Sequence, residues 1–469
     1  MIRKKGETMM EHYNIKERIN CIKKDKNFRH KTLAIAIPIA LQTLLNTTLN
    51  MVDTLMIGSL GDTSIAAVGL ANKVFFVFIL LIFGVVSGSS ILTSQYWGKR
   101  DVTNIRRVLG MSLLLGIGAS ILFTVPSLIW PGGVMRIFTP SKSMITIGTK
   151  YLVIVCLSYP IIAVTNSYVA LLRGVNQVKA PVVISVFAIL INITFNYLLI
   201  YGKFGFPELG VAGAATATVI ARIFECAALL CVVYIHRGPA AARIKELLDF
   251  NITFVKIYFK HVSTVIVNEF MWGLGVTMYS LVYGRMGDIA TAAITITQTV
   301  EQIFMVIFQG IGGATAIIIG NVLGANKLKK AEEYAKNFMF LQFIFGILIL
   351  IVCLLIKGSV ISLFHATNEV ARLVDLSLTV FAIYAPFKMF NFINIVGILR
   401  SGGDTKITLF LDVTGVWLIG VPLAVLGGLV FKQPIYIVYA MVLVEEIYKF
   451  VLGYIRYRKK IWLRNIVND

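Results

Sequence analysis

Twelve apolar stretches, each at least 20 residues long, constrain the fold more than any other feature of the chain. They cover residues 33–57, 74–96, 108–130, 146–171, 180–201, 210–235, 261–283, 291–322, 337–356, 374–398, 406–429 and 434–456. About 20 helical residues cross the hydrocarbon core of a bilayer. The backbone must form its own hydrogen bonds there, so the stretches are expected to be helices. The sequence therefore predicts an all-α polytopic membrane protein with 12 transmembrane helices.

The distribution of basic residues predicts the orientation of these helices. The 469 residues carry a formal net charge of +21, although only 14% are charged. With the N-terminus placed in the cytoplasm, the connections on that side hold 33 Lys and Arg residues, and the opposite connections hold 8. This bias predicts both termini inside a cytoplasmic membrane. It also argues against a nucleic-acid partner, because the charge is divided among seven short segments.

The chain contains an internal repeat. A shift of 226 positions places LGDTSIAA (60–67) on MGDIATAA (286–293), and a shift of 227 places LLRGVNQVK (171–179) on ILRSGGDTK (398–406). Each half then has six spans, so the halves are expected to be parallel six-helix repeats in a two-lobed V shape. The predicted organisation is a basic tail (1–31), an N-lobe (32–235), a cytoplasmic linker (236–260), a C-lobe (261–456) and a second basic tail (457–469).

Two similarly oriented bundles that meet at a cleft favour a transporter over an enzyme. The sequence contains no HExxH, GxSxG or Walker A motif, and its five cysteines and five histidines show no ligand spacing. We therefore expect no catalytic residue, no cofactor and no metal site beyond a coupling ion. Alternating access by rocking of 1–235 against 261–469, in a monomer, is the predicted mechanism. A structural or channel-forming protein remains an alternative, in which the intramembrane acids would be dispensable.

Polar residues inside the first half predict a cation site. Gln42, Asn46, Asn50 and Asp53 are spaced 4, 4 and 3 residues apart, and so form one stripe on the first span. A charge in the membrane centre costs about 2.5–3.5 kcal/mol, which makes Asp53 a candidate for binding H⁺ or Na⁺.

Further polar residues lie on the fifth and sixth spans. Asn192 and Asn196 share a face of the fifth span, and Thr218 lies on a small-residue face of the sixth. Their oxygens could complete the site around Asp53, or they could serve only to hold helices together.

The second half offers Glu269, an acid with no basic residue within a helical turn, as a candidate proton carrier. Lys388 is expected to neutralise one of the acids, and the aromatic and Met side chains would suit planar cations. Arg173 and Arg400 are expected at the cytoplasmic mouths, where they would only position the chain. The substrate cleft is predicted to be lined by Gln42, Asn46, Asn50, Met271, Trp272, Gln298, Glu301 and Lys388.

Several phrases together resemble the multidrug and toxic compound extrusion (MATE) transporters of the bacterial NorM/DinF-like branch, over nearly all of residues 30–460. They are NMVDTLMIGSLGDTSIAAVGLA, ALLRGVNQVKAP, NYLLIYGKFGFPELGVAGAATAT, VNEFMWGLG, GNVLGANKLKKAE and GILRSGGDTKITL. The resemblance implies an antiporter that exports organic cations and drugs in exchange for Na⁺ or H⁺. It also implies cation coupling at Asp53, Asn192 and Thr218 in the N-lobe and at Glu269 in the C-lobe.

Two positions depart from the family pattern. Asn196 stands where many members have an aspartate, and Met389 stands where a second C-lobe acid is expected. One acid per lobe slightly favours H⁺ over Na⁺, although asparagine oxygens are adequate Na⁺ ligands. A flippase for lipid-linked oligosaccharides is the alternative function, and it would require a more cationic cleft.

Overall fold

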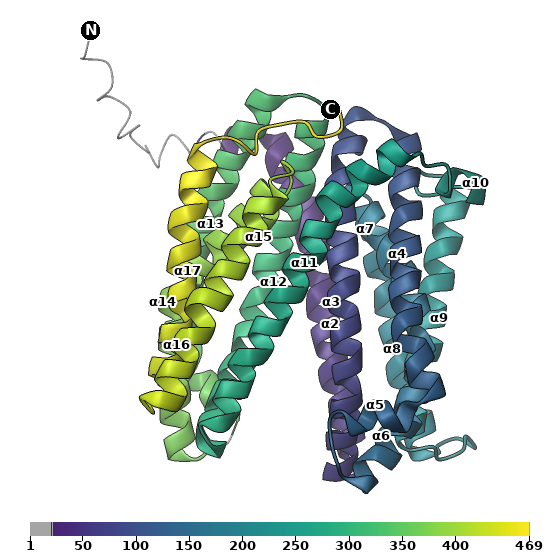
Figure 1. Cartoon of the computed structure of the whole chain (residues 1–469), viewed down its shortest axis with the longest axis vertical. Helices are drawn as coiled ribbons and strands as arrows, with labels where there is room; N and C mark the ends of the chain where they lie inside the picture. The colour runs from purple at the N-terminus through teal and green to yellow at the C-terminus, as the bar shows by residue number, and fades with distance from the viewer. Residues whose placement is uncertain (1–19, 21, 365, 469) are drawn as a thin grey trace.

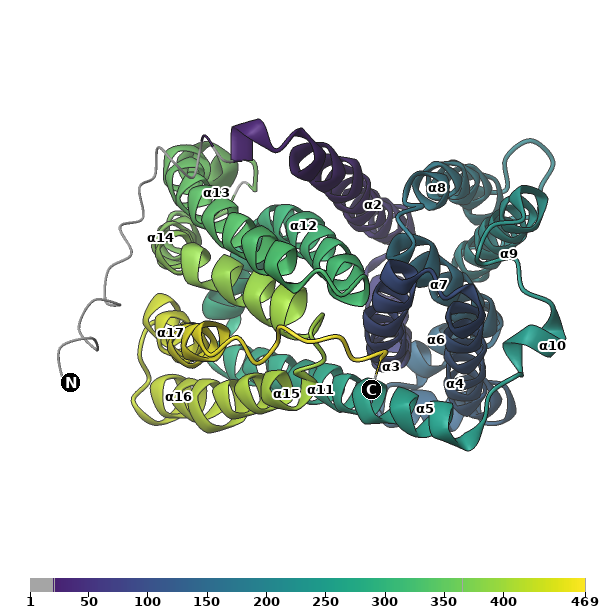
Figure 2. The same cartoon turned by 90° about the horizontal axis from the view of Figure 1, so that it is seen from above.

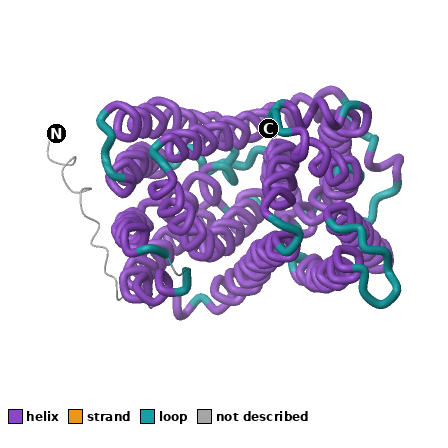
Figure 3. The backbone as a smooth tube through the Cα atoms, turned by 90° about the horizontal axis from the view of Figure 1, so that it is seen from below, coloured by secondary structure: helices purple, strands orange, loops and turns teal. Residues whose placement is uncertain are grey.

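The computed structural model describes residues 20, 22–364 and 366–468, and no strand occurs among them (Figure 3). The helices form two bundles that lie side by side (Figures 1 and 2). The first contains α2 (Lys26–Gly58), α3 (Asp62–Lys99), α4 (Val102–Ile129), α5 (Pro131–Arg136), α6 (Lys142–Val155), α7 (Ser158–Gly174), α8 (Lys179–Tyr201) and α9 (Val211–His236).

The short helix α10 (Ile244–Leu247) lies between the bundles in sequence. The second bundle also contains π-helical turns, which are labelled η. Its elements are α11 (Ile252–Arg285), α12 (Asp288–Gly324), α13 (Leu328–Ser362), α14 (Asn368–Asn391), η1 (Phe392–Leu399), α15 (Thr405–Thr414), η2 (Gly415–Gly420), α16 (Val421–Val425), η3 (Leu426–Val430) and α17 (Ile435–Arg458).

The helices agree with the prediction of a multi-pass membrane protein, but fewer than twelve meet a strict apolar criterion. In the described chain, ten helices are long and apolar enough to cross a membrane. The count rises to eleven when α6 and α7, which meet at a bend of 47°, form one span. The twelfth predicted stretch, 434–456, forms the continuous helix α17. Glu445, Glu446 and Lys449 in this helix keep it below the criterion.

The first helix of each bundle begins against the other bundle. At the start of α2, the ring of Phe28 lies 4.9 Å from the rings of both Tyr334 and Phe338 on α13. At the start of α11, the hydroxyl of Tyr258 lies 2.7 Å from that of Ser89 on α3. Helix α11 begins at Ile252, within the predicted linker 236–260. The Asn251 side chain caps this end of the helix by accepting a hydrogen bond from the Phe254 amide.

The bundles make their closest backbone contacts near one end of α3 and α12. Gly98 lies directly against the backbone of Asn321, and Gly324 lies directly against that of Gln95. A Cβ atom on Gly84 would lie only 2.7 Å from the Cα of Ile266 in α11. Glycine thus permits an approach that any side chain would prevent.

The C-terminal segment after α17 covers this junction (Figure 1). Trp462 is fully buried, and its ring stacks on Tyr457 with 5.9 Å between the ring centres. The amide of Ile466 donates to Gln95 Oε1 at 2.9 Å, and Gln95 Nε2 donates to the Ser401 carbonyl at 2.6 Å. The segment that the sequence predicted only as a basic tail therefore ties the second bundle to α3.

Candidate functional site

The predicted cation-binding residues of the first half lie together. Asn196 Nδ2 on α8 donates to Asp53 Oδ1 on α2 at 2.6 Å and to Asn192 Oδ1 at 3.0 Å. Asn192 Nδ2 in turn lies 3.5 Å from Thr218 Oγ1 on α9. These four residues, here called the Asp53 cluster, join three helices by a chain of hydrogen bonds that ends on a carboxylate.

The chemistry of the Asp53 cluster suits a proton or a small hard cation. Its side chains provide carboxylate, amide and hydroxyl oxygens, which can all accept hydrogen bonds or ligate metal cations. The Oδ1 atom of Asn196 is buried without a hydrogen-bond partner. Rotation of this amide would present Oδ1 to Asp53, where it could accept a hydrogen bond from the protonated acid. The hydrogen bonds of the Asp53 cluster can therefore stabilise either protonation state of Asp53.

A second polar layer lies along α2 beside the Asp53 cluster. Gln42 Nε2 donates to Ser185 Oγ at 3.2 Å, and Gln42 Oε1 accepts from Arg173 at 2.5 Å. Arg173 is therefore tied to the bundle interior and is more than the mouth residue that the sequence predicted. Asn46 lines a polar cavity of about 50 Å³, which has room for a few water molecules.

The acid and base on α9 complete this layer. Ser185 Oγ donates to Glu225 Oε1 at 2.8 Å, and Arg222 forms an ion pair with Glu225 at 2.7 Å. Both α9 residues also line the small polar cavity with Gln42 and Asn46. Asn50, the remaining residue of the predicted stripe, is exposed.

In the second bundle, Glu269 belongs to a buried ion network. Its carboxylate lies 2.6 Å from Arg400 Nη1, and the Arg400 side chain is only 3% exposed. Arg400 also lies 3.6 Å from Asp412, which accepts a hydrogen bond from Asn268 at 2.9 Å. Arg400 directly follows the end of η1, but its side chain is buried in this network, so it does more than position the chain at a cytoplasmic mouth. Glu269 lacks a basic neighbour in the sequence, but the chain supplies one from 131 positions away.

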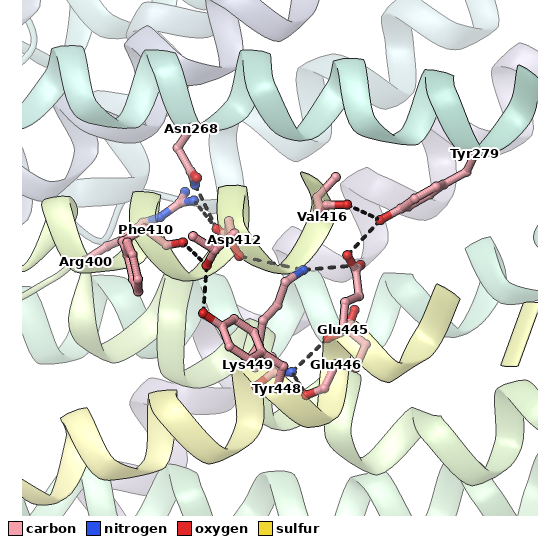
Figure 4. A network of polar contacts seen from close by, with 12 residues as sticks. Asn268, Tyr279, Arg400, Phe410, Asp412, Val416, Glu445, Glu446, Tyr448 and Lys449 are labelled. Atoms are coloured by element: carbon pink, nitrogen blue, oxygen red, sulfur yellow. Dashed lines mark hydrogen bonds and ion pairs between the residues drawn. The ribbon is translucent and has the colours of Figure 1, made fainter. Parts of the chain in front are cut away.

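The same network continues through α17 (Figure 4). Lys449 lies 4.0 Å from Asp412 and 3.3 Å from Glu445, which accepts a hydrogen bond from the Tyr279 hydroxyl at 2.8 Å. Next to them, Glu446 accepts from the Asn391 side chain at 2.8 Å. This group, here called the Arg400 network, has four acids: Glu269, Asp412, Glu445 and Glu446. Its ion pairs involve two bases, Arg400 and Lys449.

The internal repeat relates the two polar regions, and it is the signal that could have revealed the network. Arg400 and Lys449 lie 227 positions after Arg173 and Arg222. Asn268 lies 226 positions after Gln42 and Asp412 lies 227 after Ser185, so the Asn268–Asp412 and Gln42–Ser185 hydrogen bonds occupy equivalent places. Asp412 was not among the predicted site residues, because its equivalent in the first half is the serine Ser185.

The predicted cleft residues of the second half differ in burial and in hydrogen bonding. Lys388 forms an ion pair with Glu301, which also accepts a hydrogen bond from the Tyr439 hydroxyl at 2.8 Å. Gln298 is half-buried, and the Met271 carbonyl accepts a hydrogen bond from the Trp417 indole at 3.0 Å. Trp272 is 42% exposed. Among the described residues, no group of three or more His, Cys, Asp or Glu side chains could hold a metal ion.

Comparisons with known proteins indicate the family of the chain. The MatE family model matches residues 38–198 and 264–426. The uncharacterized transporter YisQ of Bacillus subtilis (strain 168) is 24% identical over 94% of this chain and 96% of its own length. The probable multidrug resistance protein NorM of Thermotoga maritima is 24% identical, over 84% of this chain and 85% of its own length.

A solved structure supports the fold. The outward-facing conformation of a multidrug resistance MATE family transporter superposes with a TM-score of 0.82, at 19% identity, over 92% of this chain and 95% of that one. The family model matches two segments that together make up more than half of the chain. The chain belongs to the MATE (MatE) family of membrane transporters.

Proposed function

We propose that this transporter is a secondary antiporter that exports organic, mostly cationic and amphipathic compounds in exchange for H⁺ or Na⁺. It acts as a monomer in the cytoplasmic membrane, with both termini inside and 12 spans arranged as two parallel repeats. The relatives named as multidrug resistance proteins support the extrusion of small organic compounds. The proposal of ion coupling rests on the chain of hydrogen bonds in the Asp53 cluster.

The Asp53 cluster supports coupling because hydrogen bonds link its acid to two further helices. Asp53 on α2 accepts from Asn196 on α8, and the chain reaches Thr218 on α9. Protonation of Asp53, or Na⁺ binding, changes which of these groups can donate. The relative free energies of two helix arrangements then depend on ion occupancy. An organic cation that binds better to one arrangement is thereby linked to the ion.

The charge of the Arg400 network favours protons as the coupling ion. Fully ionised, its four acids and two bases would leave two negative charges uncompensated in a membrane-spanning bundle. Desolvation of such charges costs several kcal/mol each, and a proton is the smallest cation that could offset one of them. In the Asp53 cluster, Asn196 in place of the expected second acid points the same way, because Na⁺ ligation gains most from paired carboxylates.

The contacts between bundles support alternating access. The bundles meet through Gly98 and Gly324, under a C-terminal segment tied to Gln95, at the end proposed to be cytoplasmic. Residues 1–235 and 261–469 would rock against each other about this contact. The lipid-linked oligosaccharide flippase is not favoured, because Glu301 neutralises Lys388, one of the few cleft bases available for a pyrophosphate.

Transport by purified protein in liposomes tests this function. Efflux of a fluorescent organic cation would be followed for wild type, Asp53→Asn and Glu269→Gln under an imposed proton or sodium gradient. We expect the proton gradient to drive efflux by wild type and not by Asp53→Asn, with Thr54→Ser as a neighbouring control of normal activity. Wild-type efflux that responds to neither gradient would contradict the antiporter proposal.

A further inference from the structure

A cavity of about 500 Å³ lies in the first bundle, away from the Asp53 cluster. It is lined by the beginnings of α2 and α8, the end of α7 and its connection to α8, the end of α9 and the segment that follows α9. Among the described residues that line it, the titratable ones are His30, Lys31, Lys179 and His236, and none is an acid. The cavity is therefore built to accept negative charge.

The remaining wall of the cavity is largely apolar. Ile35 on α2 and Val233 on α9 are buried there, and small side chains such as Ala34 leave the space open. An inorganic anion would leave this apolar wall unused. A ligand with an anionic head and a hydrocarbon chain would use both parts.

The cavity lies where a membrane lipid can reach it. Lys31 is the last basic residue before the apolar part of α2, and basic residues at such a place attract anionic headgroups. Beyond the cavity, Leu33 and Ile37 on α2 are 56% and 58% exposed, and Val183 and Phe187 on α8 are each 55% exposed. Exposed apolar side chains on a spanning helix face lipid, so a chain leaving the cavity would meet the bilayer.

We propose that this cavity is a binding site for one anionic phospholipid. Its phosphate would lie between Lys31 and Lys179, and an acyl chain would run past Ala34 and Ile35 towards the lipid-facing side of α2. The site is separate from the ion-coupling residues and does not depend on the proposed antiport.

Binding of short-chain phospholipids to the full-length protein in a neutral detergent tests the proposal. Dihexanoyl phosphatidylglycerol, dihexanoyl phosphatidylcholine and glycerol 3-phosphate would be titrated separately, with bound ligand counted by native mass spectrometry. We expect one phosphatidylglycerol, bound at least tenfold more tightly than phosphatidylcholine. Each basic residue near an anionic headgroup contributes about a fivefold factor, so Lys31→Gln/Lys179→Gln should weaken binding by about 30-fold.

Two further variants separate the pocket from general surface charge. Lys256→Gln/Lys329→Gln removes the same charge from exposed positions that do not line the cavity, and it should bind like wild type. Ala34→Phe keeps every charge but fills the apolar part, and it should lose phosphatidylglycerol binding while its elution volume and melting temperature stay close to those of wild type.

Three results would overturn the proposal. The first is equal affinity of wild type for the two phospholipids. The second is unchanged phosphatidylglycerol binding in both the Lys31→Gln/Lys179→Gln and the Ala34→Phe variants. The third is binding of glycerol 3-phosphate as tight as that of phosphatidylglycerol, which would identify a site for soluble phosphate compounds instead.

Discussion

The ion pair between Glu269 and Arg400 should be strongly coupled. The two charged atoms lie 2.6 Å apart, and the side chains are 10% and 3% exposed. Replacing Arg400 by Met leaves Glu269 and Asp412 without their guanidinium partner, and breaking a buried pair in this way costs about 3–5 kcal/mol. Replacing Glu269 by Leu removes a charged hydrogen bond, which costs about 1.5–3 kcal/mol.

The double variant Glu269→Leu/Arg400→Met distinguishes a true pair from two independent effects. Once Arg400 is absent, Glu269 has lost the interaction that stabilised its charge, so its removal should cost little more. The coupling energy is then expected to equal most of the smaller single loss, about 1.5–3 kcal/mol. Reversible unfolding of the purified protein in mixed detergent and sodium dodecyl sulfate measures all four free energies.

An exposed ion pair on the same protein supplies the control. Arg107 and Asp249 lie 2.8 Å apart, but their side chains are 24% and 64% exposed. A double-mutant cycle on this pair should give a coupling energy within about 0.2–1 kcal/mol. If the Glu269–Arg400 coupling is no larger than that of the exposed pair, the account of a desolvated network around Arg400 is wrong.

Three further predictions follow from the contacts between bundles and from the linker. Gly324→Leu should prevent the close approach to Gln95 and shift the protein away from the arrangement in which α3 and α12 touch. Labelling of a cysteine introduced at Ser94 should therefore increase. Gly358→Leu, at a position with open space around it, should leave that labelling unchanged. Gln95→Ala should release the C-terminal segment, measured as faster amide exchange of the Ile466 peptide, and unchanged exchange would contradict the proposed tie. The hydrogen bond from the Arg243 amide, together with Arg106, lowers the pKa of Glu246 from its ordinary 4.5. The contact of α10 with Arg106 on α4 should therefore be intact above pH 4.5 and be lost as pH falls through the lowered pKa of Glu246. Amide hydrogen exchange of the linker measures this loss, and Glu246→Gln at pH 7 should show the same loss of protection as wild type in acid.

Local patterns were sufficient to predict much of the helical structure and the Asp53 cluster. Apolar length alone locates the helices, because lipid leaves the backbone no other solution. The i, i+4 spacing of Asn192 and Asn196 places both amides on one face of α8, and the structure brings that face to Asp53. The role of these residues in coupling stays a prediction.

The Arg400 network could not be read from local patterns. Glu269 and Arg400 are 131 positions apart, and Asn268 and Asp412 are 144 apart, so only the packing of α11 against the later helices joins them. Glu445, Glu446 and Lys449 lie near the end of α17, and their sequence alone is as compatible with a solvated helix end as with a buried network. Their burial depends on neighbouring helices that the sequence of α17 does not specify.

The C-terminal segment was underestimated for a related reason. Its composition is that of a basic tail, but its contacts are specific: Trp462 is fully buried, the Ile466 amide reaches Gln95, and Arg464 donates to the carbonyls of Gly402 and Gly403. A single tryptophan and hydrogen bonds to backbone carbonyls leave almost no signal in composition. The tie becomes visible only when α3 and α17 are seen in the same structure.

Proton release on substrate binding tests the central claim most directly. An organic cation would be added to the purified protein in weakly buffered detergent near neutral pH, and released protons would be counted with a pH-sensitive dye. We expect wild type to release protons in proportion to bound cation and Asp53→Asn to bind the cation with reduced or no release. Stoichiometric binding by wild type without proton release, at any pH between 6 and 8, would contradict proton-coupled antiport at Asp53.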